Sequence, residues 1–148
     1  MGKVIEKIKL MNLFEPAKWV EVEAVIDAGA TMLVLPQSVV DELGLRKIGD
    51  RRVKYANNQT QVKPVYRGVI LDIKGRVGIF DVLAEVEGSE PLVGQIVLEA
   101  LDLVVDLTTK TIIPNPRSPD MPMVEILMAA AYNECVRGTG YGADCNKN

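Results

Sequence analysis

The sequence predicts an all-β, barrel-like domain over residues 1–116, followed by a helical extension over residues 117–148. Three observations support this fold class. Short segments in which apolar and polar residues alternate recur along the first part of the chain, as is typical of half-buried strands. Turn-forming Gly, Pro and Asn residues separate these segments. After Pro116 the composition shifts toward Ala and Met, which favour helix.

The N-terminal part of the chain predicts two half-buried strands and one fully buried strand. Residues 4–10 and 17–27 alternate apolar with charged side chains, so each segment predicts a strand with one face in the core. Residues 31–36 form a continuous apolar run, which suits a strand buried on both faces.

Residues 36–45 predict the one short helix inside the domain. Ser38 is the candidate cap, and Gly44 marks the C-terminal end. The helix is followed by the chain's one basic cluster, LRKIGDRRVK, over residues 45–54. Because Asp50 interrupts the cluster and acids flank it, we interpret it as a solvated loop and not as a ligand-binding patch.

The remainder of the domain predicts hairpins. Residues 51–71 form a long hairpin in which Asn57 and Asn58 can occupy the positive-φ positions of a tight turn. Residues 69–86 give two strands joined near Gly75. The segments that follow are a turn and a short strand ending at Gly94 (87–95), one or two helical turns (96–101), and a closing hairpin (103–116).

The extension predicts a helix that begins near Asp120 as N-cap and Pro122 as an early helical residue. It either covers a sheet edge of its own domain or contacts another chain. Both cysteines, Cys135 and Cys145, lie in this extension, so they provide no disulfide framework for the core. Whether the two pair is left open by the sequence.

Composition excludes several classes of function. The net charge of −3 argues against a nucleic-acid surface, which needs clustered Lys and Arg. No apolar run approaches the ~20 residues of a membrane span, and the N-terminus is unlike a signal peptide, so we expect a cytoplasmic protein. The absence of histidine removes Ser-His-Asp and Cys-His catalysis and every His-dependent zinc site. Without a cofactor, acid–base chemistry must come from Asp, Glu, Lys, Tyr or Cys.

The segment AVIDAGATMLVLP, residues 24–36, carries the candidate chemistry. Asp27 ends an apolar strand, and Gly29 permits a tight turn directly after it. A lone carboxylate there is costly unless it is hydrogen-bonded or paired. Two such carboxylates would share a proton and could activate a water molecule. The chain has one such turn, so pairing needs a second chain related by a two-fold axis. The alternative is that Asp27 only binds backbone N–H groups of its own turn.

Four segments together resemble the retropepsin-like aspartic proteases, which are single-domain homodimers. VIDAGATMLVLP resembles the active-site segment of that family, in which Asp is followed by Thr or Ser, Gly and Ala. YANNQTQV stands where the flap hairpin is expected, PLVGQIVLEALDLVVD resembles the second apolar-Gly segment with its short helix, and VDLTTKTIIPNP resembles the closing hairpin of bacterial members. The resemblance spans roughly residues 4–116 and implies a closed or partly open barrel of the acid-protease type.

The resemblance also implies roles for individual residues. Asp27 would be the catalytic carboxylate, one from each chain, and Gly94 would let the later segment pack against the active-site loop. No metal or organic cofactor is used in the family, and the partners would be a peptide or protein substrate and a second copy of the chain. The residues implied in substrate binding are Gly29, Ala30 and Thr31 of the turn and Tyr55, Ala56, Asn57, Asn58 and Gln59 of the flap.

Ala28 departs from the family pattern. The family has Thr or Ser there, whose hydroxyl bonds to the backbone of the partner's active-site loop. Alanine lacks that hydroxyl, so we expect a weaker dimer and reduced peptidase activity. Three hypotheses follow: an aspartic endopeptidase, a silent peptide-binding or scaffold protein of the same fold, or a small β-barrel module without a groove. Asp102 and Asp106 are interpreted as structural carboxylates at a turn and a strand edge.

Overall fold

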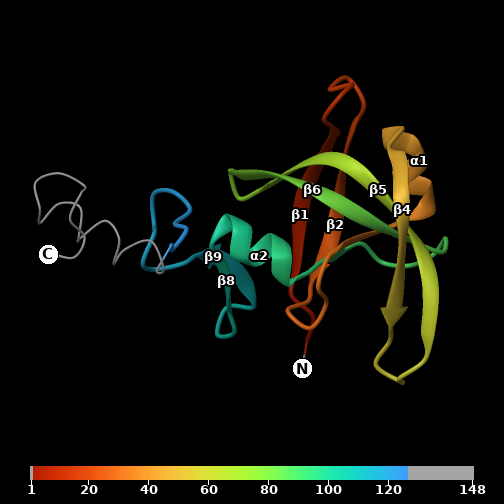
Figure 1. Cartoon of the computed structure of the whole chain (residues 1–148). Coiled ribbons are helices and arrows are strands. Elements are labelled where there is room, and N and C mark those ends of the chain that lie inside the picture. The colour runs from red at the N-terminus through yellow and green to blue at the C-terminus, as the bar shows by residue number, and fades with distance from the viewer. Residues whose placement is uncertain (1, 127–148) are drawn as a thin grey trace, which may run out of the picture.

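The computed structural model describes residues 2–126, which form nine strands and two short helices (Figure 1). The predicted order of strands, helices and hairpins is confirmed. In chain order the elements are β1 (Ile5–Asn12), β2 (Trp19–Ile26), β3 (Leu33–Pro36), α1 (Gln37–Leu43), β4 (Arg46–Lys54), β5 (Thr60–Ile73), β6 (Arg76–Glu85), β7 (Leu92–Val93), α2 (Gln95–Leu101), β8 (Leu103–Asp106) and β9 (Thr111–Pro114).

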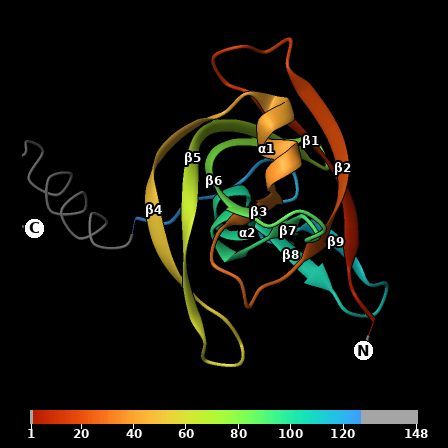
Figure 2. The ribbon, with the colours of Figure 1, turned by 90° about the vertical axis from the view of Figure 1, so that its right-hand side faces the viewer.

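Six of the strands close into a ring. The large sheet has the order β1-β2-β7-β3-β6-β5-β4, and β1 also pairs with β5. The residue pairs of β1 and β5 that close the ring run from Lys9 opposite Asp72 to Asn12 opposite Val69. Because a closed ring has no free edges, β4 is the one strand of this sheet that keeps an unpaired edge in the described part of the chain. Figure 2 shows β4 on the outer side of β5.

The core lies inside this ring. β3 is buried at all four positions, as the continuous apolar run predicted. Alternate residues of β1 and β5, such as Leu10, Val69 and Leu71, are fully buried and point into the same interior. Burying each such side chain stabilises the fold by about 1.5–3 kcal/mol. The strands therefore follow from the apolar patterns that the sequence displays, and the pairing of β1 with β5 closes them around one core.

Two local predictions were wrong. Residues 46–50 belong to strand β4 and not to a loop, whereas the hairpin strand predicted from residue 51 is confirmed; seven of the nine residues of β4 are exposed. The N-cap of α1 is Pro36, and no side chain caps the helix. The Ser38 hydroxyl instead donates to Glu87 at 2.9 Å, across 49 residues of chain. At the other end the prediction holds, because Gly44 ends α1 with φ of 66°.

The extension differs from the helix expected near its start. Residues 117–126 contain no helix, so the predicted helix does not begin at Pro122. The rest of that prediction, including Cys135 and Cys145, lies outside the described residues. Within residues 2–126 no helix is long and apolar enough to cross a membrane.

Candidate active site

Asp27 stands where two parallel strands end together. β2 pairs with β7 so that Ile26 lies opposite Val93. The next N–H, that of Asp27, donates to the Val93 carbonyl at 2.9 Å. The backbone of the candidate catalytic residue is therefore held by the sheet and not by a free loop.

The turn after Asp27 holds the carboxylate in place. The Gly29 N–H donates to Asp27 Oδ1 at 2.9 Å, and the Ala30 N–H donates to the Asp27 carbonyl at 3.0 Å. The Asp27 side chain is half-buried, whereas Ala28 and Gly29 are exposed. Among residues 2–126 no cation forms an ion pair with Asp27. The carboxylate is thus fixed by its own turn, on a surface that a second chain can reach.

Gly94 allows the start of α2 to contact this turn. A Cβ atom on the buried Gly94 would lie 2.4 Å from the Met32 carbonyl oxygen and 2.7 Å from that of Ala30, so any larger residue would displace the backbone. Two backbone hydrogen bonds form across this close contact. The Gln95 N–H donates to the Ala30 carbonyl at 2.7 Å, and the Ile96 N–H donates to the Thr31 carbonyl at 2.9 Å. The loop that contains Ala30 and Thr31 is therefore attached to α2.

The hairpin of β4 and β5 ends in a tight turn over residues 55–59. The Tyr55 N–H donates to the Gln59 carbonyl at 2.9 Å, and the Asn58 N–H donates to the Tyr55 carbonyl at 2.8 Å. Asn58 adopts a positive φ of 68°, as predicted, whereas Asn57, for which a positive φ was also predicted, does not. The Asn57 side chain accepts the Gln59 N–H at 3.0 Å. Ala56 completes the turn and is exposed.

A groove of about 720 Å³ separates this turn from the loop between β6 and β7. Tyr55, Asn57 and Gln59 of the predicted flap line it, whereas Ala56, Asn58 and the turn residues from Asp27 to Thr31 do not. The other lining residues are Val34, Gln61, Lys63, Glu85, Val86, Gly88, Ser89, Glu90 and Leu92. Leu92 links the groove to the Asp27 turn. It lines the groove, and the carbonyl of the next residue of β7, Val93, accepts the Asp27 N–H.

A polar group of Tyr55, Lys63 and Glu85 lies in this groove, and sequence reasoning named Tyr55 but missed Lys63 and Glu85. The Tyr55 hydroxyl donates to Glu85, and Lys63 Nζ lies 3.1 Å from Glu85 Oε1. Burial raises the pKa of the Glu85 carboxyl, but hydrogen bonds from Tyr55, Lys63 and a backbone N–H outweigh it and leave that pKa below its usual value. Burial, and then Glu85, raise the pKa of Tyr55 to about 12. No short window of sequence signals this group, because Lys63 and Glu85 meet only through the pairing of β5 with β6.

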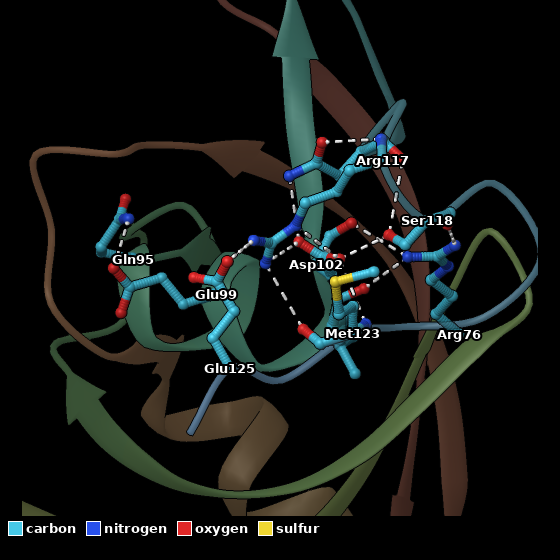
Figure 3. A network of polar contacts seen from close by, with 10 residues as sticks. Arg76, Gln95, Glu99, Asp102, Arg117, Ser118, Met123 and Glu125 are labelled. Atoms are coloured by element: carbon cyan, nitrogen blue, oxygen red, sulfur yellow. Dashed lines mark hydrogen bonds and ion pairs between the residues drawn. The ribbon is translucent and has the colours of Figure 1, made fainter. Parts of the chain in front are cut away.

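Asp102 has the structural role predicted for it, in the network of Figure 3. It follows α2 with φ of 54° and is 5% exposed. Its carboxylate accepts the Ser118 hydroxyl, the Asn115 side-chain amide at 3.0 Å and the Met123 N–H at 3.1 Å, and pairs with Arg117 at 3.1 Å. These contacts bind residues 115–123 to the end of α2.

Arg76 supports the same network from β6. Its guanidinium donates to the Leu101 and Asp102 carbonyls at 2.9 Å each and to the Ser118 carbonyl. A buried guanidinium is tolerated here because three backbone oxygens accept its N–H groups. The chain after β9 is therefore anchored to the ring, as well as to α2.

We expect Asp102→Asn to destabilise the protein at neutral pH, by an amount that shrinks in acid. The Ser118 hydrogen bond, and then Arg117 and the other donors, hold the pKa of Asp102 well below its usual value. A carboxyl with a lowered folded-state pKa stabilises the fold above its unfolded pKa of about 3.9, and this contribution is lost as the pH falls toward the folded value. Thermal unfolding from pH 7 to pH 2 should therefore show the two proteins converging below about pH 4.

The matched control for this measurement is Asp81→Asn. Asp81 is exposed in the middle of β6, so the same chemical change should move the unfolding temperature little. If Asp102→Asn remained equally destabilised at every pH, the loss would come from packing and not from the ionised carboxylate.

Comparison with known proteins agrees with this geometry. Residues 18–84 match a family model described as aspartyl protease. The matched segment runs from the start of β2 almost to the end of β6, so it contains Asp27, its turn and the β4–β5 hairpin. A search of curated proteins finds no match. The retropepsin subtype and the effect of Ala28 stay predictions. The match over residues 18–84 supports an aspartic protease-like family for this chain.

Proposed function

We propose that the chain is an aspartic endopeptidase whose active site is completed by a second copy of itself. The observation that carries the proposal is the position of Asp27. Its backbone N–H is held by β7 and its carboxylate accepts the Gly29 N–H, in a turn with two exposed residues, inside the segment that matches the aspartyl protease model. A carboxylate in this position needs a partner of the same kind to act as an acid–base pair.

In the proposed reaction two Asp27 carboxyl groups share one proton and a water molecule. The ionised carboxylate takes a proton from the water, whose oxygen attacks the peptide carbonyl carbon. The protonated carboxyl then supplies a proton to the leaving nitrogen as the C–N bond breaks. The products are a carboxylic acid and an amine, so one water molecule is consumed. The pair again holds one proton, now on the other carboxyl group, and the two-fold axis makes the two arrangements equivalent.

The groove supplies the proposed substrate site. Val34 and Leu92 offer apolar contacts, and Lys63 with Glu85 offers a polar one, in a space of about 720 Å³. The turn over residues 55–59 would close over that peptide by strand-like pairing. The groove also argues against the hypothesis of a β-module without a binding groove.

The test is peptidase activity measured together with oligomeric state. Cleavage of an unfolded protein between about pH 4 and pH 7 should show a specific activity that rises with protein concentration until the dimer saturates. Analytical ultracentrifugation should place the dimer midpoint in the same concentration range. Specific activity independent of concentration, from a chain that sediments as a monomer throughout, would contradict a shared active site.

The second candidate is a silent peptide-binding protein of the same fold, which the absence of a hydroxyl at Ala28 favours. In that case peptides would bind without turnover, and Asp27→Asn would leave the dissociation constant unchanged. Isothermal titration with an uncleaved peptide, run beside the cleavage assay, separates the two candidates.

A further inference from the structure

Strand β4 has a free edge that pairs with no other strand within residues 2–126 and takes no part in the proposed chemistry. It pairs only with β5, and it is the last strand of the large sheet. Seven of its nine residues are exposed. An edge strand directs half of its backbone N–H and C=O groups outward, where another extended segment can pair with them.

The edge is strongly cationic in a chain that is acidic overall. β4 contains five Lys or Arg residues and one carboxylate, Asp50, whereas the whole chain has a net charge of −3. Asp50 is already paired with Lys47 at 3.1 Å. Among residues 2–126, the other four cations of β4 form no ion pair. These four are Arg46, Arg51, Arg52 and Lys54.

A small cavity lies at one end of the β4 edge. Arg46 lies directly opposite Arg67 of β5, and both line a space of about 310 Å³. The Arg67 guanidinium stacks on the Phe14 ring, 4.9 Å from its centre. Phe14 is held by Asn12, a residue 3% exposed that accepts the Phe14 N–H at 2.8 Å and donates to the Leu43 carbonyl at 2.8 Å. The Arg46 and Arg67 side chains therefore start from directly opposite positions on the hairpin and line the same cavity, whose Phe14 wall is held in place by Asn12.

The charge pattern selects among possible occupants of the edge. A second copy paired through its own β4 would bring Lys and Arg residues against each other, which is unfavourable between neighbouring strands. A nucleic acid would meet the charges but has no backbone N–H and C=O ladder to match the open edge. An extended polypeptide with acidic side chains satisfies both the hydrogen-bonding groups and the cations.

We propose that the free edge of β4 binds an extended acidic segment of another protein as an added β-strand, with carboxylates facing Arg51, Arg52 and the Arg46–Arg67 pair. This contact lies on the outer side of the hairpin and does not involve Asp27. It would bring a partner, or a substrate with an acidic tract, to the chain independently of cleavage.

The test uses a fluorescent nine-residue peptide, the length of β4, in which pairs of Glu are separated by single Val residues, so that carboxylates leave both faces of the added strand as Arg51 and Arg52 do. Its binding to the full chain is measured by anisotropy, beside a peptide with Lys in place of Glu. Arg51→Glu combined with Arg52→Glu should weaken binding of the acidic peptide by about tenfold or more. Lys7→Glu combined with Lys110→Glu makes the same change in net charge at exposed sites elsewhere and should leave it within about twofold, since distant exposed charges are screened. Asp27→Asn should have no effect.

Amide hydrogen exchange on the unmodified chain supplies the second readout. Peptide binding should protect amides within residues 46–54 but not those of β8 or β9. The proposal is overturned if no β4 amide gains protection, if the Lys peptide binds as well, or if the control variant loses as much affinity as the β4 variant. Tighter binding of a nucleic acid than of the acidic peptide would also overturn it.

Discussion

Replacing Asp27 with asparagine should lower kcat/KM for peptide cleavage by about 10²–10⁴-fold, the contribution expected of a positioned acid–base group. Asparagine has nearly the shape of aspartate, and its side-chain oxygen can still accept the Gly29 N–H. The turn should therefore keep its geometry while it loses the ability to exchange a proton. Because both chains of a dimer carry the change, the acid and the base are lost together.

The control for Asp27→Asn is Asp81→Asn, purified in parallel. Both variants remove one negative charge, but Asp81 is exposed in β6 and far along the chain from the turn. Asp81→Asn should keep full activity, which would also exclude a contaminating peptidase. Full activity in Asp27→Asn, with sedimentation unchanged, would remove Asp27 from the chemistry.

The sequence predicts the strands and the Asp27 turn because both depend on local pattern. β3 is a continuous apolar run and is buried throughout, and Gly75 and Asn58 occupy positive-φ turn positions, as their types favour. The prediction failed over residues 46–50 of β4 because that strand lies on the edge. Both of its faces are largely solvated, so charged residues fill six of its nine positions, and Ile48 and Val53, five residues apart, display no alternation.

Other parts of the site depend on contacts between residues far apart in the chain. The Ser38 hydroxyl donates to Glu87 and does not cap α1, and Lys63 pairs with Glu85 on the neighbouring strand β6. Neither pairing leaves a sign within a short window of sequence. Gly94 was placed near the active-site loop by the family resemblance, and the carbonyls 2.4 and 2.7 Å from its missing Cβ give the steric reason.

Ala28→Thr should strengthen the dimer and raise activity at low protein concentration. In the proposed dimer each threonine hydroxyl would bond to the backbone of the partner's turn. Each hydrogen bond contributes on the order of 1 kcal/mol, and two-fold symmetry gives two of them. The sum of about 2 kcal/mol corresponds to a dissociation constant lower by about 30-fold. Because Ala28 is exposed in the single chain, the added atoms should meet no clash there.

Ala28→Val is the matched control, since valine has the shape of threonine without the hydroxyl. Sedimentation and cleavage are measured for the unmodified chain, Ala28→Thr and Ala28→Val over one concentration series. Ala28→Thr should lower the protein concentration at which the dimer is half formed and raise the specific activity at low concentration. Ala28→Val should do neither. An equal gain from valine would assign the effect to packing. A tighter threonine dimer that still cleaves nothing would exclude the endopeptidase and leave the silent peptide-binding protein, because the missing hydroxyl would then not be what limits catalysis.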